Sequence, residues 1–184
     1  KEGTTKAINT WYKNRFFRSR LEARWAVFFD ALGIEWEYEK EGFDLGNGDW
    51  YLPDFWIPSF HCFWEIKPRG GYTQEDANKY IKFTLPLAVA QGYPGGLNDY
   101  TVDIYGAPYV EEIDDYATWC SFSIGEGWIA QCPNCKKVDF VFGGWAGYIR
   151  GCHCWDSPYK AYKESGIEHE SFQDAVRLSM SARF

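Results

Sequence analysis

The stretch Tyr51-Leu-Pro-Asp-Phe-Trp-Ile-Pro-Ser-Phe-His-Cys-Phe-Trp-Glu-Ile-Lys67 decides the fold that this sequence predicts. Its aromatic and β-branched residues favour two strands, with a break from Pro58 to His61. If the hairpin turns in the middle of that break, residues at equal distances from the turn face each other, which places Asp54 opposite Glu65. The two-residue period of a strand then puts Lys67 on the same face as Glu65.

Two facing carboxylates repel each other, at a cost of up to about 1 kcal/mol, unless a cation lies between them. Mg²⁺ suits this position, because it binds one or two protein carboxylates and completes its shell with water and phosphate oxygens. A lysine beside such an ion can position the attacking water and offset charge that builds on a phosphate. The hairpin therefore predicts a divalent-metal site at Asp54, Glu65 and Lys67. An ordinary edge hairpin with solvated charges is the alternative interpretation.

In these residues the chain resembles the PD-(D/E)XK nuclease superfamily. Pro53-Asp54 corresponds to the "PD" element, and Glu65-Ile66-Lys67 to the "(D/E)XK" element. The resemblance implies an α/β fold with a mixed sheet, a restriction-endonuclease-like core over roughly residues 15 to 106. It also implies that Asp54, Glu65 and the Ile66 backbone carbonyl bind Mg²⁺ or Mn²⁺, and that Asp54, Glu65 and Lys67 are catalytic.

Residues 16–33 carry the clearest helical pattern in the chain, and Gly33 fits its end. Ser19 and Glu22 have the spacing of a capping box, so Glu22 can simply close the first turn. The resemblance implies instead that Glu22 is a further catalytic residue and metal ligand. The apolar residues that recur at helical spacing are Leu21, Trp25, Phe28, Phe29 and Leu32.

Basic residues near the predicted helices are candidates for contact with nucleic acid. Arg18, Arg20 and Arg24 can each hold a phosphate through two hydrogen bonds. Lys79 and Lys82 are further candidates, on the next predicted helix. A solvated basic face is the alternative interpretation, above all for Arg24.

The remaining elements of the predicted core have weaker signals. Residues 34–45 alternate apolar and acidic side chains, as a half-exposed strand does. Asn47-Gly48 then predicts a hairpin turn. A helix is expected over residues 73–91, although Pro86 must break or kink it. Residues 99–105 are expected to form one more strand of the central sheet.

Two cysteine pairs, Cys132-Pro-Asn-Cys135 and Cys152-His-Cys154, predict a zinc-ribbon-like module. In such a module a Cys-X-X-Cys turn lets both thiolates reach one ion. The second pair is one residue shorter than usual, and His153 could replace one thiolate. Zn²⁺ would be structural here, because four protein ligands leave no open position. Two disulfides or an iron–sulfur cluster are the alternatives.

Composition limits the classes of function that remain. The 184 residues are 20% aromatic, which argues against disorder, and a net charge of −7 excludes indiscriminate binding of polyanions. No run of eighteen apolar residues predicts a membrane span. The expected location is therefore the cytoplasm, of a bacterium or of a phage-infected host. The expected partner is DNA, and a homodimer is one expected arrangement, because many proteins of the family cut both strands as dimers.

The prediction that follows is a Mg²⁺-dependent DNA endonuclease with four segments. They are an irregular N-terminal extension over residues 1–14, the nuclease core over 15–118, the zinc-ribbon-like module over 119–156 and a helical tail over 157–184. Two alternatives belong to other classes of function. The chain could bind nucleic acid without cutting it, or it could contact partner proteins through its aromatic surface.

Overall fold

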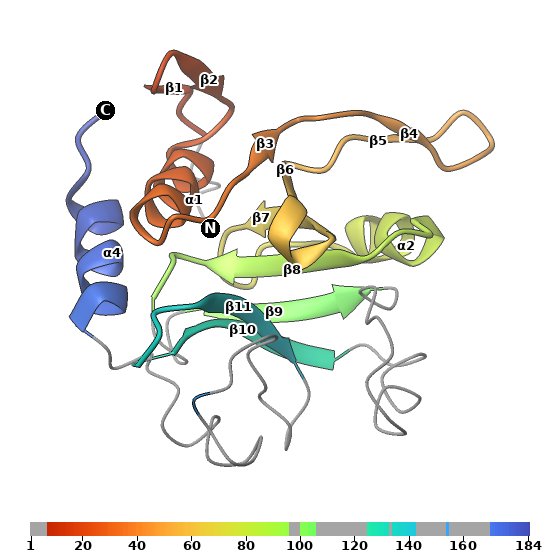
Figure 1. Ribbon diagram of the computed structural model, residues 1–184. Helices are drawn as coiled ribbons and strands as arrows, with labels where there is room; N and C mark the ends of the chain where they lie inside the picture. Colours follow the sequence, from red (N-terminus) through yellow and green to blue (C-terminus); the bar gives the residue numbers. More distant parts are fainter. Residues whose placement is uncertain (1–6, 96–99, 106–124, 133, 143–153, 155–169) are drawn as a thin grey trace.

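The computed structural model describes residues 7–95, 100–105, 125–132, 134–142, 154 and 170–184 (Figure 1). Its centre is a mixed sheet with the strand order β11-β10-β9-β8-β7-β6-β3. β7 and β8 are parallel, and every other neighbouring pair in this sheet is antiparallel. The strands are β3 Glu37–Tyr38, β6 Phe55–Ile57, β7 Cys62–Lys67, β8 Leu87–Gly92, β9 Tyr100–Tyr105, β10 Gly125–Gln131 and β11 Val138–Phe142. A mixed α+β architecture, as predicted, is confirmed.

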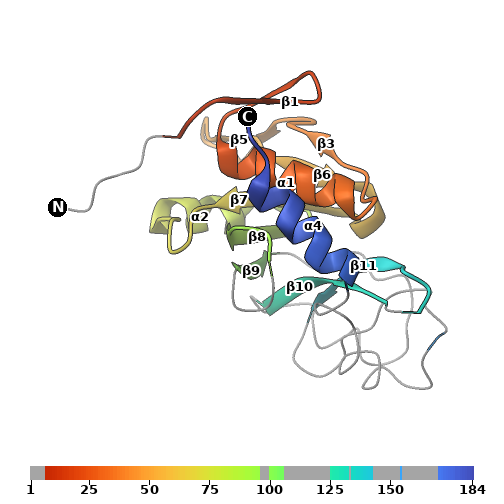
Figure 2. The same cartoon turned by 90° about the vertical axis from the view of Figure 1, so that its left-hand side faces the viewer.

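Helices cover both faces of the sheet (Figures 1 and 2). α1 (Arg20–Ala31) and α4 (Glu170–Ser181) pack together on one face, where Trp25 and Phe28 of α1 join Trp64 of β7 in the core. α2 (Gln74–Lys82) covers the other face, where Tyr80 joins a second apolar cluster. β7 alternates between these two clusters, as strand period requires. Glu65 and Lys67 therefore lie on the face of β7 that α2 covers.

The predicted helix over residues 73–91 is only half right. α2 ends at Lys82, and Leu87–Gly92 is the strand β8, which runs parallel to β7. Alanine favours a helix in isolation, but Pro86 ends the helical pattern, and this segment has strands on both sides. The fold therefore contains a β7-α2-β8 crossover, with α2 held against the polar end of β7.

The predicted strand over residues 34–45 is split in two. β3 joins the central sheet, while β4 (Phe43–Asp44) pairs with β5 (Trp50–Tyr51) in a separate ribbon. The turn of this ribbon is at Asn47-Gly48, as predicted, and both residues have positive φ. Glu39 lies at the point of division and also has a positive φ, of 47°.

The N-terminal region is more regular than the sequence suggested. A hairpin of β1 (Thr10–Tyr12) and β2 (Arg15–Phe17) precedes α1, so the helix begins at Arg20 rather than near residue 16. At the other end of the chain α4 confirms a helix in the tail, and residues 155–169 lie outside the described part. No helix within the described ranges is long and apolar enough to cross a membrane.

Candidate functional site

The β6–β7 hairpin has the register that the sequence predicted. Phe55 pairs with Trp64, and the same register continued by one residue places Asp54 opposite Glu65. A short 3-10 turn closes the hairpin. Asp54 precedes β6, and its Oδ2 accepts a hydrogen bond of 2.7 Å from the Ile66 backbone N–H. The carboxylate is thus fixed to the edge of β7 by the main chain.

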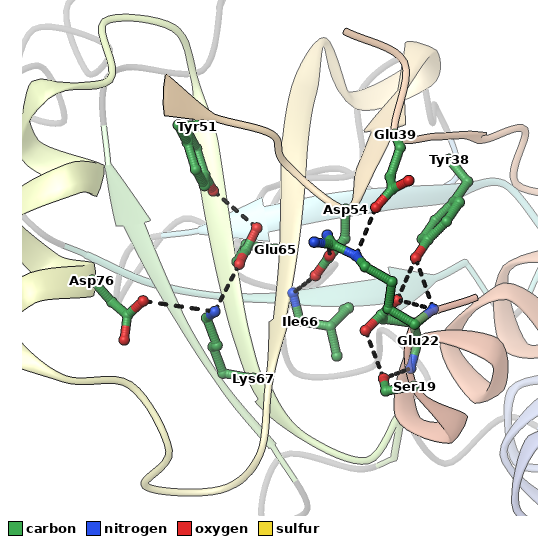
Figure 3. Close-up of polar contacts among 11 residues, drawn as sticks. Ser19, Glu22, Tyr38, Glu39, Tyr51, Asp54, Glu65, Ile66, Lys67 and Asp76 are labelled. Atoms are coloured by element: carbon green, nitrogen blue, oxygen red, sulfur yellow. Dashed lines mark hydrogen bonds and ion pairs between the residues drawn. The ribbon is translucent and has the colours of Figure 1, made fainter. Parts of the chain in front are cut away.

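Three acidic side chains are buried around this point (Figure 3). Asp54 is 3% exposed, Glu65 5% and Glu22 7%. They come from three separate places, the residue before β6, the middle of β7 and the first turn of α1. Buried carboxylates are rare unless they are paired or bind a metal, so this burial sets them apart from an ordinary solvated hairpin.

Glu65 is held between Lys67 and Tyr51. Lys67 Nζ lies 3.0 Å from Glu65 Oε1, and the Tyr51 hydroxyl donates to Glu65 Oε2 at 3.0 Å. Lys67 Nζ also lies 3.8 Å from Asp76 Oδ1. The other Asp76 oxygen accepts from the N–H and the hydroxyl of Thr73, both at 2.8 Å, and so closes the N-terminus of α2. Asp76 thereby connects α2 to Lys67.

Glu22 is enclosed by hydrogen-bond donors. Its Oε1 accepts from the Ser19 hydroxyl at 2.6 Å, and its Oε2 accepts from the Tyr38 hydroxyl at 2.5 Å. The Arg18 backbone N–H also donates to Oε2, at 3.2 Å. Ser19 caps α1 by accepting from the Glu22 N–H, so the predicted capping relation is confirmed. The role of Glu22 as a metal ligand stays a prediction.

Burial and like charge shift the titration of the two central carboxyls. Burial raises the pKa of Asp54 well above its usual range, and the negative charges of Glu65 and Glu22 raise it further. Burial also raises the pKa of Glu65, against the opposing effect of Lys67. Burial alone would lower the pKa of Lys67, but the negative charge of Glu65 raises it overall, so the amine stays protonated.

The site carries more negative than positive charge. Within 4 Å, Arg18 and Lys67 contact four carboxylates, those of Glu39, Asp54, Glu65 and Asp76. Glu22 adds a further buried carboxyl, which raises the pKa of Asp54. A hard divalent cation would compensate this excess, and carboxylate and carbonyl oxygens are the ligands that Mg²⁺ and Mn²⁺ prefer. The chemistry of the donor set therefore fits such an ion.

Only some of the residues predicted to contact nucleic acid lie at this site. Arg18 lies in it, and Arg20 is exposed at the start of α1. Lys79 and Lys82 lie on α2 and pair with carboxylates, at 3.1 Å to Glu75 and 2.8 Å to Asp49. Neither lysine is paired with a carboxylate of the site.

Arg24 points away from the carboxylates to the end of α4. Its Nη1 donates to the backbone carbonyls of Ser179, at 2.5 Å, and Met180. Arginine near the last carbonyls of a helix offsets their partial negative charge. Arg24 thus has a structural partner, which the sequence could not reveal because α4 is so distant in the chain.

A second candidate site lies at the tip of the β10–β11 hairpin. The Sγ atoms of Cys132, Cys135 and Cys154 all lie within 4.8 Å of one another, which is the only such group of possible ligands within the described ranges. The turn is closed by hydrogen bonds of 2.8 Å from the Cys132 N–H to the Lys137 carbonyl and 2.9 Å from the Lys136 N–H to the Cys132 carbonyl. This cluster could bind a metal such as zinc. Cys152 and His153 lie outside the described residues.

Several contributors to the carboxylate site were missed at the level of sequence. They are Tyr38, Glu39, Tyr51 and Asp76. Thr73 and Asp76 do show capping-box spacing, which could have fixed the start of α2. Nothing local, however, indicates that Asp76 faces Lys67, because that contact depends on the crossover.

The chain matches no family model, no curated protein and no solved structure at a significant level. Its site is therefore interpreted from its own geometry.

Proposed function

We propose that this chain is a divalent-metal-dependent nuclease that hydrolyses phosphodiester bonds in DNA. The observation that carries the proposal is the burial of Asp54 and Glu65 at facing positions, with Lys67 Nζ 3.0 Å from Glu65. Solvated charges on an edge hairpin would not be buried in this way. Buried like charges with a protonated amine beside them are a common arrangement for phosphoryl chemistry.

Each residue has a defined part in the proposed reaction. Asp54, Glu65, the Ile66 carbonyl and Glu22 would hold Mg²⁺ or Mn²⁺. When bound, such an ion polarises a phosphate oxygen and lowers the pKa of a coordinated water. Lys67 would orient the attacking water and offset the charge that builds on the phosphate. The attacking water would give up a proton to solvent as it adds at phosphorus, the P–O bond to one nucleoside would break, and the leaving oxygen would take up a proton from solvent.

Neighbouring residues would position this machinery and the substrate. Tyr51 fixes the orientation of Glu65, and Asp76 restrains Lys67 from the side of α2. Arg18, with Arg20 beside it, would hold a phosphate next to the scissile bond. Lys79 and Lys82 would bind the more distant backbone, where exchange of their surface ion pairs costs little.

The cysteine cluster would complete a structural Zn²⁺ site with Cys152 as the fourth ligand. Three of these thiols already lie close enough to share one ion. The site would brace the β10–β11 hairpin, which continues the central sheet through β9. No catalytic part is proposed for it, because four thiolates leave no open position.

One observation favours a second candidate, a module that binds nucleic acid without cutting it. The carboxylate oxygens of Glu22, Asp54 and Glu65 do not all lie within 4.8 Å of one another, since the cysteines form the only described group that does. A protein in which Arg18 and Lys67 permanently neutralised these acids would still offer a phosphate-binding surface.

A cleavage assay separates the two candidates. Single-stranded, duplex and branched DNA would be incubated with Mg²⁺, Mn²⁺ or EDTA, and wild type compared with Glu65→Gln. Loss of this group should lower the metal-dependent rate by at least about 10²-fold. Glu41→Gln, at an exposed carboxylate outside the site, serves as the control. DNA binding with no cleavage under any condition would favour the binding module, and no binding at all would refute both.

A further inference from the structure

Arg18 bridges two carboxylates, that of Glu39, which follows the edge strand β3, and that of Asp54, which precedes β6. Its Nη2 lies 3.1 Å from Asp54 Oδ1, and its Nε lies 2.6 Å from Glu39 Oε1. The arginine side chain is 54% exposed, whereas Asp54 is buried. The guanidinium thus connects the buried Asp54 to the partly buried Glu39.

The backbone of Glu39 is unusual and is held in place by Asp54. Glu39 follows β3 and has a φ of 47°, in the left-handed region that residues with a side chain seldom adopt. Its N–H donates to the Asp54 carbonyl oxygen at 2.8 Å. Asp54 therefore makes two links to Glu39. Its carbonyl oxygen accepts from the Glu39 N–H, and its carboxylate contacts the same arginine as the Glu39 carboxylate. These links fix the spacing of the two acids.

Arg18 is an obstacle to a metal at Asp54. Asp54 Oδ2 is occupied by the Ile66 N–H at 2.7 Å, so Oδ1 is the oxygen better placed for another ligand. The guanidinium contacts that oxygen, and a dication in the same place would be repelled by it. The proposed metal site thus requires Arg18 to leave Oδ1.

We propose that Glu39 is a positioning residue that makes Arg18 a displaceable counter-ion. Arg18 neutralises Asp54 until a divalent cation binds, and it then moves off Oδ1 while Glu39 keeps its hold on Nε. The freed Nη groups face the entering phosphodiester. Arg18 thus neutralises Asp54 before the metal binds and contacts the phosphate afterwards. This inference rests on the proposed nuclease function and adds an order of events and a role for Glu39.

Metal binding without nucleic acid tests the first half of the inference. Isothermal titration with Mn²⁺ would compare wild type, Arg18→Ala and Arg15→Ala. Arg15→Ala is the control for charge, because Arg15 contacts the Tyr38 carbonyl and not Asp54. We expect Arg18→Ala to bind Mn²⁺ at least about tenfold more tightly, and Arg15→Ala less than about threefold. Equal effects of the two variants, or weaker binding by Arg18→Ala, would overturn the inference.

Kinetics with saturating metal test the second half. Glu39→Gln should raise KM for DNA severalfold with a smaller effect on kcat, whereas Glu37→Gln, two residues earlier on β3 and paired with Lys40, should not. In the Arg18→Ala background, Glu39→Gln should have no further effect, because Glu39 acts through Arg18. Additive effects would overturn the inference. A wild-type protein that binds no Mn²⁺ would instead refute the proposed function itself.

Discussion

At the scale of single residues, Asp54 lies in an environment that disfavours its negative charge. It is buried, it faces Glu65, and it is also near the negative charge of Glu22. The Ile66 N–H and Arg18 offset part of this cost, but the pKa of Asp54 stays raised. A functional site often keeps such an unfavourable charge, and the free energy of unfolding is lower for it.

We predict that Asp54→Asn stabilises the protein while abolishing metal-dependent cleavage. The amide oxygen can still accept from the Ile66 N–H, and the repelling charge is gone. Unfolding by urea at pH 7.5 should show a gain of about 1 kcal/mol, with no such gain for the exposed control Glu41→Gln. A loss of stability would mean that the ion pair with Arg18 outweighs the repulsion.

The raised pKa of Asp54 determines the direction in which the stability of the protein changes with pH. A carboxyl whose folded pKa exceeds its unfolded value contributes stability below the unfolded pKa, near 4, and loses it as pH rises through the folded pKa. The advantage of Asp54→Asn should therefore grow with pH across the mildly acidic range. Urea unfolding at several pH values between 4 and 8 measures it. A constant difference would contradict the assigned protonation.

Proton release should also accompany metal binding. Because burial raises the pKa values of Asp54 and Glu65, a divalent cation must displace any proton that they hold. The affinity for Mn²⁺ should rise with pH through the mildly acidic range. Titration in two buffers of different ionisation enthalpy counts the protons released. Uptake of protons, or none at any pH, would show that other ligands bind the ion.

At the scale of elements, local signals predicted what local contacts determine. The register of β6 and β7, the Ser19 cap and the Asn47-Gly48 turn all depend on neighbouring residues, and all were predicted correctly. β8 was not, because its alanines favour a helix while its pairing with β7 is a long-range contact. The contact from Lys67 to Asp76 depends on that crossover and was missed with it.

The cap of α2 offers a test at this scale. Thr73→Ala removes the acceptor for the Asp76 N–H and one donor to its carboxylate. We expect a loss of about 1 kcal/mol in the free energy of unfolding, and a reduced cleavage rate because Asp76 restrains Lys67. Thr84→Ala, an exposed threonine beyond the helix, should change neither quantity. Normal cleavage by Thr73→Ala would show that the cap of α2 does not affect the function of the site.

At the scale of the whole molecule, the cysteine hairpin and the last helix are parts of one body. β10 pairs with β9, and Gln131 at the end of β10 accepts from Ser171 of α4 at 2.6 Å. Phe172 of α4 packs edge to face on Phe28 of α1. These contacts connect the turn that carries Cys132 and Cys135 to the helices on one face of the sheet.

If the cysteine cluster binds zinc as proposed, loss of the ion should destabilise more than the hairpin. We predict that Cys135→Ser lowers bound zinc, measured by elemental analysis, and reduces the melting temperature by several degrees. Asn134→Ala, an exposed change in the same turn, should do neither. Unchanged stability after complete removal of zinc by a chelator would show that the cluster does not stabilise the rest of the fold.

The pairing of α1 with α4 also bears on the order in which the fold can be completed during synthesis. α1 carries Glu22, and its Phe28 packs against Phe172 of α4. α4 is synthesised after every other described element. A nascent chain without residues 170–184 lacks that partner and the Arg24 contacts at the end of α4. Contacts so distant in sequence form late in folding. The acidic cluster would thus be completed only after residues 170–184 have been synthesised.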